Sequence, residues 1–329
     1  MRDRHALLIG GAGYIGRHVG FELCDRGYHV SIVDNLSTGS PDYLPTTDLR
    51  VTDIVDMDFA EVEDLKGKVT DVVHLAALTS VPESVKNPSS FFRVNTHGTL
   101  RAAMLAGYLE SENFTLSSTA AVYGEPEYNP VDEEHPLRPI NPYGSSKLAG
   151  EVIGRELCKR MGIGYGVLRY FNVAGADPAL RTGDMRPAGD NLAHKLLECI
   201  DGARSEKFEI YGSDYDTPDG TAVRDFVHVS DVASAHVCVL GKLQEDCVSS
   251  VVVNVGYGFG RSVGELVAAL RRIAPDRFCV DATQAARRPG DPSAVWASSD
   301  QLHSLGWRAK YDCIERIFET ELAWHDKVK

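Results

Sequence analysis

The sequence contains no apolar run that approaches the ~20 residues needed to cross a bilayer as a helix. It has no basic tail, and its formal net charge of -13 disfavours a protein that follows phosphates along nucleic acid or an anionic membrane. Its seven cysteines show no C-x-x-C spacing, so we predict no metal site and interpret them as thiols of a reducing compartment. These absences leave a protein whose partners are small molecules.

The chain is long enough for two packed regions, with 329 residues of which 43% are hydrophobic. Met1 to His5 run directly into a short apolar segment, without a long apolar region or a small-residue cleavage site. We therefore expect no cleavable leader and a cytoplasmic location.

The first residues form a strand, turn, helix and strand pattern. Ala6 to Ile9 is an apolar run that stops at a group of glycines, and helical periodicity follows from Tyr14 to Arg26. Val30 to Val33 then predicts a second strand, closed by Asp34. The right-handed crossover of such a βαβ unit makes its two strands parallel neighbours.

The alternation continues far along the chain. Further strands are predicted at Val69–Leu75, Phe114–Ser117 and Gly164–Arg169, and helices over about Pro88–Leu109 and Tyr143–Met161. The pattern predicts an α/β fold with a doubly wound parallel sheet of the Rossmann type. We assign this Rossmann domain to residues 1–171, with 225–257 partly returning to it.

The second half of the sequence differs from the first in composition and in its pattern of apolar residues. Ala174 to Asn191 is rich in Gly, Pro, Asp and Arg, and is typical of an ordered binding loop. Strand and helix patterns resume at Phe208–Tyr211, Phe226–Leu243, Val251–Val255 and Val263–Ile273. We therefore predict a smaller α/β substrate domain, residues 172–224 and 258–329, over the carboxyl edge of the sheet.

The glycines after the first strand predict a dinucleotide site. Gly11-x-Gly13-x-x-Gly16 fits the dinucleotide fingerprint, and Gly10-x-x-Gly13-x-x-Gly16 fits the wider spacing of short-chain dehydrogenases. Glycine lets the backbone approach a pyrophosphate at the helix amino terminus, where free N–H groups favour anions. Asp34 can accept hydrogen bonds from both ribose hydroxyls and repels the extra phosphate of NADP, so NAD is the predicted cofactor.

A second group of residues predicts proton transfer. Tyr143 and Lys147 are four apart and share one helical face, where an ammonium and an oxidised nicotinamide would lower the pKa of the phenol. An upstream strand ends in the hydroxyls of Ser117, Ser118 and Thr119, any of which could orient a substrate oxygen. His74, by contrast, is interpreted as a packed, hydrogen-bonded residue and not as a catalyst.

With these residues in place, the chain resembles the extended short-chain dehydrogenase/reductases, and among them the UDP-glucose 4-epimerases (UDP-galactose 4-epimerases). The similarity spans essentially the whole length. It rests on GGAGYIG at 10, VDNLSTG at 33, PESV at 82, SSTAAVYG at 117, NPYGSSK at 141, RYFNVAGADP at 169, YGSDYDTPDGTAVRDFVHVSD at 211 and RRPGD at 287. The stretch from 211 is the most diagnostic, because nucleotide-fold glycines occur in many families.

The resemblance implies roles for individual residues. The catalytic group is Thr119, Tyr143 and Lys147, and the alignment selects Thr119 over Ser117 and Ser118. The predicted NAD-binding residues are Gly10, Gly13, Tyr14, Ile15, Gly16, Asp34, Asn35, Leu36, Ser37, Thr38, Gly39, Asp53, Ile54, Leu75, Ala76, Ala77, Asn95, Ser117, Tyr143, Lys147 and Tyr170. The predicted UDP-sugar residues are Thr119, Asn172, Asn191, Leu192, Tyr211, Arg224, Arg288, Asp291 and Val295.

The implied reaction is an isomerisation that uses a redox cofactor. Tyr143 takes the proton of the sugar 4-hydroxyl while hydride passes from C4 to tightly held NAD. The 4-keto sugar then turns about the diphosphate and receives hydride on its other face. Because the sugar must turn while the diphosphate stays in place, we expect the site to bind the nucleotide firmly and the hexose loosely. Relatives pair as homodimers through helices that include the one bearing the catalytic tyrosine, and we expect the same here.

Two positions depart from the best-known members. Thr79 stands where some bacterial epimerases carry a lysine near the NAD phosphates, so NAD retention is expected to be weaker. Val295 stands where a tyrosine in some relatives excludes N-acetylated sugars, so we expect some activity on UDP-GlcNAc and UDP-GalNAc.

Alternative functions remain open at this point. One is a 4-epimerase that prefers another UDP-sugar, such as UDP-GlcNAc, UDP-xylose or UDP-glucuronate. A sugar-nucleotide 4,6-dehydratase needs an Asp-Glu pair after its threonine, where this chain has Ala120 and Ala121. A non-catalytic NAD sensor should have lost Tyr143 or Lys147, and both are present.

Overall fold

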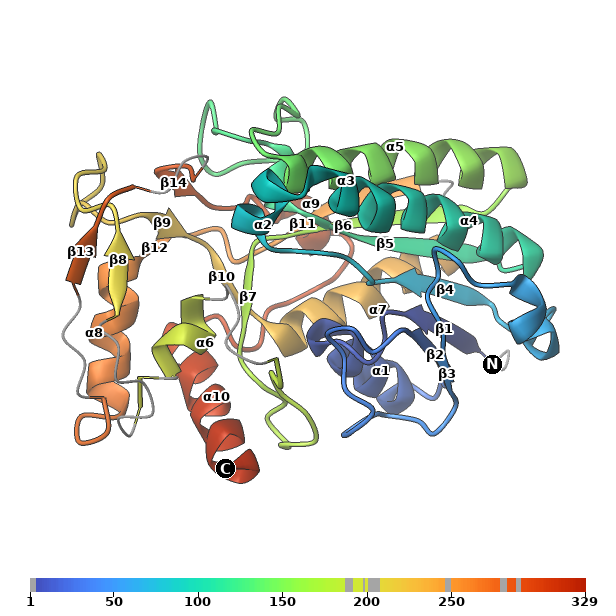
Figure 1. The fold of residues 1–329 in the computed structure, drawn as a ribbon, viewed down its shortest axis with the longest axis horizontal. Coiled ribbons are helices and arrows are strands. Elements are labelled where there is room, and N and C mark those ends of the chain that lie inside the picture. The colour runs from blue at the N-terminus through green and yellow to red at the C-terminus, as the bar shows by residue number, and fades with distance from the viewer. Residues whose placement is uncertain are drawn as a thin grey trace.

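A central sheet of seven parallel strands organises the chain in the computed structural model, which describes residues 4–186, 192–197, 199–200, 208–245, 250–278, 283–287 and 291–329. The strand order is β11-β6-β5-β4-β1-β2-β3 (Figure 1). The strands are β1 His5–Ile9, β2 His29–Asp34, β3 Leu49–Val51, β4 Asp71–His74, β5 Asn113–Thr119, β6 Gly164–Tyr170 and β11 Ser250–Val255. The order reverses between β1 and β4, which is where doubly wound sheets bind ligands.

Helices cover both faces of this sheet, which explains why its inner strands are apolar runs and not alternating patterns. Helices α4 (Gly98–Tyr108) and α5 (Pro142–Met161) lie on one face, and α1 (Tyr14–Asp25) and α7 (Val229–Glu245) on the other (Figure 1). Shorter elements lead into α4 or follow strands: η1 Phe59–Leu65, α2 Val81–Lys86, α3 Pro88–Phe91, the π-helical turn η2 Phe92–His97 and η3 Ala120–Val122.

Local residues fix the bounds of α5, the helix that carries the predicted catalytic pair. The Asn141 side chain accepts a hydrogen bond from the Gly144 N–H at 2.9 Å, and Pro142 occupies the first turn. Gly162 ends the helix in the left-handed conformation, with φ +71°. The amino end of α5 is thereby held next to the loop that follows β5.

The remaining elements form a second packed region beside the sheet (Figure 1). Its helices are α6 Leu192–Leu197, α8 Val263–Ile273 and α10 Ile314–Val328, while α9 Asp300–Ser304 packs through Leu302 against the central sheet at β11. Three small sheets join them: β7 Asn172–Ala174 with β10 Phe226–His228, β9 Val223–Arg224 between β12 Arg261–Ser262 and β14 Ala294–Val295, and β8 Glu209–Tyr211 with β13 Thr283–Ala285. Strand β11 also comes from the second half of the sequence, but it pairs with β6 in the central sheet.

The predicted fold class, a doubly wound parallel sheet with a smaller α/β region, is confirmed. The predicted strand Val69–Leu75 starts later, at Asp71, because the Val69 N–H bonds the Leu65 carbonyl in a turn after η1. The predicted strand Phe114–Ser117 extends to Thr119, which pairs with Tyr170. In the described parts of the chain, no helix is long and apolar enough to span a membrane.

Candidate active site

The glycine turn after β1 leaves the amino terminus of α1 open to an anion. Gly10 has φ +82°, and its N–H bonds the Val33 carbonyl at 2.8 Å. A Cβ on Gly16 would strike the backbone of Gly10 and Gly11, so the turn closes this tightly only with glycine. Gly13 precedes α1 without a capping side chain, and no acidic residue occupies the first turn. The backbone N–H groups at this end of α1 therefore suit a pyrophosphate.

Asp34 connects this turn to the loop after β2. One carboxylate oxygen accepts from the Ala12 N–H at 2.9 Å, and the other from the Leu36 N–H at 2.8 Å. Each oxygen keeps a second lone pair, which is what a pair of ribose hydroxyls requires. Burial raises the pKa of Asp34, and these two N–H donors oppose the rise. The residues present therefore fit the adenosine end of NAD.

Neighbouring loops complete the predicted cofactor cradle. The amide of Asn35 donates to Asp53 at 3.0 Å, and Asp53 also accepts from the Val55 N–H at 2.9 Å. A Cβ on Gly39 would lie 3.0 Å from the Ala12 backbone, so this loop packs on the glycine turn. The structure thus brings the predicted residues from three successive strand ends to one edge of the sheet.

Tyr143, Lys147 and Thr119 meet at the carboxyl edge of the sheet. Thr119 ends β5, and its hydroxyl accepts from the Ala121 N–H at 3.1 Å, while its side chain lies close enough to Tyr143 to influence the pKa of the phenol. Lys147 is 3% exposed on the same face of α5 as Tyr143. The Tyr143 ring meets Phe91 edge-on, with centroids 6.4 Å apart. The hydroxyl of Ser118, in contrast, donates to Glu151.

Burial governs the electrostatics of this group. It raises the pKa of Tyr143, and the Thr119 side chain opposes the rise. Burial lowers the pKa of Lys147 to about 8, and the Glu151 carboxylate opposes that change. Lys147 is not among the groups that shift the pKa of Tyr143, and the expectation that it lowers this pKa beside an oxidised nicotinamide stays a prediction.

His74 is packed as predicted, but the expectation that it is hydrogen-bonded is wrong. It is 1% exposed at the end of β4, and neither ring nitrogen has a hydrogen-bond partner among the described residues. Burial, followed by the positive charge of Lys147, lowers its pKa to about 3. The imidazole is therefore neutral, so the buried ring carries no charge that needs a partner.

Two predicted cofactor residues hydrogen-bond other residues of the protein through their polar side chains. The Tyr170 hydroxyl pairs with Nε2 of His236 on α7, and burial raises the pKa of Tyr170 well above its ordinary value. The Asn95 amide bonds the backbone of Leu78 and the hydroxyl of Ser146. A role for Tyr170 and Asn95 in holding NAD stays a prediction.

Several predicted UDP residues gather around β9. Arg224 donates to Asp291 and, at 2.6 Å, to the Pro292 carbonyl, while Val295 on β14 is its register partner. Asn172 on β7 is held by its N–H to the Asp225 carbonyl at 2.9 Å. The other described members lie on separate elements of this region: Tyr211 ends β8 and Leu192 begins α6. Asn191 and Arg288 lie outside the described residues.

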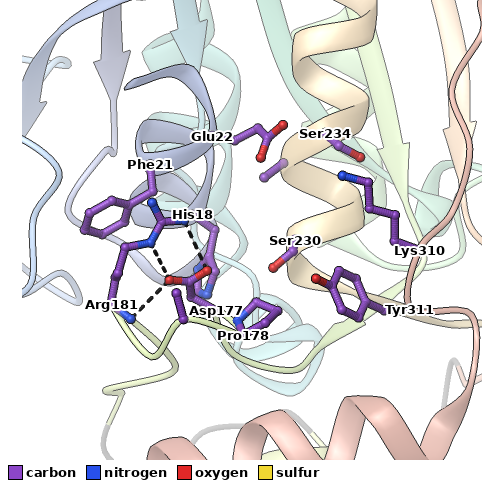
Figure 2. A pocket seen from close by; sticks show the side chains of 12 residues that line it. His18, Phe21, Glu22, Asp177, Pro178, Arg181, Ser230, Ser234, Lys310 and Tyr311 are labelled. Atoms are coloured by element: carbon purple, nitrogen blue, oxygen red, sulfur yellow. Dashed lines mark hydrogen bonds and ion pairs between the residues drawn. The ribbon is translucent and has the colours of Figure 1, made fainter. Parts of the chain in front are cut away.

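A cavity of about 210 Å³ opens between α1, α7 and the loop at 177–181. Figure 2 shows His18 and Phe21 on one side, Asp177 bound to Arg181 below them, and Ser230 and Ser234 opposite. None of the predicted site residues is among those that line it. In the described parts of the chain, no group of His, Cys, Asp and Glu side chains could hold a metal ion.

The sequence reasoning missed two buried charged residues behind the catalytic group. Glu151 follows Lys147 by four residues on α5, and Arg169 precedes Tyr170 on β6. The two form an ion pair with 2.8 Å between Arg169 Nη2 and a Glu151 oxygen. A signal was present, since the spacing of four that links Tyr143 to Lys147 continues to Glu151.

The sequence is similar to a known protein family and to known enzymes. The sequence model described as the NAD dependent epimerase/dehydratase family matches residues 6–256. A UDP-glucose 4-epimerase of Azospirillum brasilense is 42% identical over 327 residues, 97% of this chain and 91% of that protein.

Solved structures are similar over nearly the whole chain. A UDP-glucose 4-epimerase from Stenotrophomonas maltophila, with bound NAD and formylated UDP-arabinopyranose, superposes with a TM-score of 0.91 at 32% identity, covering 99% of this chain and 98% of that one. The UDP-Glc/GlcNAc 4-epimerase from Campylobacter jejuni gives a TM-score of 0.81 at 37% identity, covering 98% and 99%.

Proposed function

The chain belongs to the NAD dependent epimerase/dehydratase family, and from this premise we propose that it interconverts UDP-galactose and UDP-glucose. It is an NAD-dependent sugar-nucleotide 4-epimerase that works through a transient 4-keto sugar. Family membership agrees with the resemblance drawn from the motifs, and the curated relatives over nearly the full length are UDP-glucose 4-epimerases.

One observation carries the proposal: the buried phenol of Tyr143 lies close enough to the Thr119 side chain for Thr119 to oppose the rise in its pKa, and it shares a helix face with Lys147. These three groups lie at the sheet edge that also bears the open amino terminus of α1. A proton-transfer group beside a dinucleotide cradle is what oxidation of a sugar alcohol requires.

In the proposed mechanism, Tyr143 accepts the proton of the sugar 4-hydroxyl and later returns it. Thr119 holds the Tyr143 phenol and orients the reacting oxygen. Lys147 supplies a positive charge next to the phenol, and holds the nicotinamide ribose. Bound NAD supplies the acceptor and donor of hydride. The glycine turn, Asp34 and the Asp53 loop are the residues that would hold it.

The substrate is held through its nucleotide. Arg224, paired with Asp291, offers a guanidinium suited to bidentate contact with a diphosphate. Asn172, Leu192 and Tyr211 are proposed to contact the UDP moiety from their own elements, and Asn191 and Arg288 from segments outside the described residues. The hexose is left without a firm clamp, so that the keto sugar can turn.

We also propose that the enzyme accepts UDP-GlcNAc and UDP-GalNAc. Val295 occupies the predicted sugar-limiting position, and a valine leaves more space than a tyrosine. A structural relative at 37% identity is described as a UDP-Glc/GlcNAc 4-epimerase, which supports the broader range. The dehydratase alternative lacks support, because Ala120 and Ala121 after Thr119 carry no titratable group.

The enzyme is proposed to be a cytoplasmic homodimer. Its described cysteines are free thiols, as expected in a reducing compartment. Met104 on α4 and Val152 on α5 are 43% and 45% exposed on the outer helices of one sheet face. Pairing of these helices between two copies would cover them, and sedimentation of the purified protein tests the assembly.

A coupled assay with a panel of UDP-sugars tests the function. UDP-galactose should be converted to UDP-glucose with bound NAD and without net consumption of cofactor. Turnover of a different UDP-sugar alone would leave the family correct and the substrate wrong.

A further inference from the structure

Glu151 extends the row of functional residues on α5. Tyr143, Lys147 and Glu151 follow one another at intervals of four residues, so they share one face of the helix over two turns. Glu151 is only 7% exposed, and both of its carboxylate oxygens are bonded. This charge lies one turn from Lys147, and the proposed mechanism assigns it no task.

Arg169 binds this carboxylate in a two-point contact. Its Nε donates to one oxygen of Glu151 at 3.1 Å and its Nη2 to the other at 2.8 Å. The hydroxyl of Ser118 also donates to Glu151. Burying a lone carboxylate is costly, and a bidentate guanidinium is the partner that compensates such a charge most completely.

The ion pair joins the three elements that carry Thr119, the pair of Tyr143 and Lys147, and Tyr170. Ser118 precedes Thr119 on β5, Arg169 precedes Tyr170 on β6, and these two residues are register partners in the sheet. Arg169 also donates to the Tyr123 hydroxyl at 3.0 Å, and Tyr123 donates to Asn254 on β11 at 2.7 Å. Movement of α5 relative to β5 or β6 would break this network.

We propose that Glu151 is a positioning residue for Lys147: it fixes the height of α5 against β5 and β6, and its negative charge keeps the Lys147 ammonium protonated beside Tyr143. The inference rests on the proposed function, because it concerns the proton-transfer group of that reaction. Arg169 and Ser118 in turn hold Glu151 in place.

The charges around Lys147 support this role. Its own helix presents Tyr143 and Glu151, β4 presents the neutral ring of His74, and β6 presents Tyr170 beyond Tyr143. Glu151 is the negative charge that opposes the fall in the pKa of Lys147. Around Glu151 itself stand Arg169 and Ser118, with Glu133 acting on Arg169 from farther away.

The test measures the proton affinity of Lys147 directly. Protein labelled with carbon-13 in lysine is titrated by NMR, and the Lys147 resonance is identified by its loss in Lys147→Met. The variants are Glu151→Gln, which is isosteric but neutral, and Glu151→Gln with Arg169→Met, which removes both charges. Tyr165→Phe is the matched control, because the Tyr165 hydroxyl donates to the backbone carbonyl of Glu151, at 3.0 Å, and not to its carboxylate.

We expect Glu151→Gln to lower the proton affinity of Lys147 about tenfold and to move the alkaline limb of kcat/KM to lower pH. In the double variant the proton affinity of Lys147 should lie between that in Glu151→Gln and that in the wild type. The reason is that the double variant leaves no unpaired guanidinium near Lys147. Tyr165→Phe should titrate as the wild type does.

A folded Glu151→Gln protein in which Lys147 titrates as in the wild type would overturn the proposal. If Glu151→Gln does not fold, the double variant decides, and an unchanged Lys147 titration there would overturn it equally. A wild-type enzyme without epimerase activity would refute the proposed function instead, since the NMR titration reads Lys147 without catalysis.

Discussion

The side-chain amide of Asn95 pairs with the backbone of Leu78 in both directions, accepting from its N–H at 2.8 Å and donating to its carbonyl at 3.0 Å. The same amide donates to the Ser146 hydroxyl at 2.9 Å, one residue before Lys147. Asn95 lies in the π-helical turn η2, buried to 1% exposure. It therefore ties the loop after β4, where NAD is predicted to bind, to the catalytic helix.

Asn95→Ala should weaken NAD retention. The substitution leaves both backbone groups of Leu78 without their partner, which should lower the free energy of unfolding by about 1–3 kcal/mol. The measurements are the NAD content after dialysis and thermal unfolding. Asn87→Ala is the control, because Asn87 is exposed and its amide bonds only Glu83. Equal NAD content in Asn95→Ala and the wild type would refute this role.

Glu321 should make the stability of the enzyme fall as the pH rises. Burial raises its pKa to about 8, one oxygen accepts from the Gly175 N–H at 2.8 Å, and the other has no partner among the described residues. The folded chain thus binds this proton more tightly than the unfolded chain does, so raising the pH from the ordinary Glu value to about 8 favours unfolding.

The difference between wild type and Glu321→Gln isolates this effect. Relative to the variant, the wild type should lose up to about 1.4 kcal/mol per pH unit in that interval, by denaturant unfolding at several pH values. Glu319→Gln, an exposed change on the same helix α10, should leave the pH dependence unaltered. Parallel profiles for wild type and Glu321→Gln would show that the buried carboxyl is not protonated.

Val295→Tyr should narrow the range of sugars. Val295 is 7% exposed and packs in a cluster with Tyr123 and Phe171, so the larger ring must project toward the proposed sugar pocket or strain the cluster. We expect the ratio of UDP-GlcNAc to UDP-glucose turnover to fall at least about tenfold, with an overpacking cost of about 1–3 kcal/mol. Val295→Ile is the control. A wild-type enzyme with good UDP-galactose turnover and no UDP-GlcNAc activity would contradict the proposal.

The sequence predicts the strand ends well because chemistry and pattern coincide there. The glycines after β1, Asp34 after β2 and the hydroxyls at the end of β5 each stop an apolar run, and each lies at the carboxyl edge of the sheet. Strand β3 escaped prediction, since three residues with exposed or half-exposed side chains leave no apolar run. The strands β9, β12 and β14 of one small sheet have two residues each, too few to show a period.

Partnerships between distant residues could not be predicted from local pattern. The pairing of Arg169 with Glu151, of Tyr170 with His236, and of Arg224 with Asp291 depends on how separate elements pack. The same holds for the pKa of Tyr143, which desolvation raises although a lysine is four residues away. The spacing of residues along a helix predicts which side chains share a face. The protonation state of those side chains depends on their burial, which the spacing does not give.

The central claim is that the Tyr143 phenol moves the proton of the sugar 4-hydroxyl, and Tyr143→Phe tests it most directly. The initial rate of UDP-galactose conversion to UDP-glucose is compared with that of the wild type and of Tyr165→Phe, which removes the hydroxyl of a buried tyrosine that bonds a backbone carbonyl of α5. The account predicts a loss of roughly 10²–10⁴-fold for Tyr143→Phe, with bound NAD retained. Interconversion at the wild-type rate by that variant would contradict it.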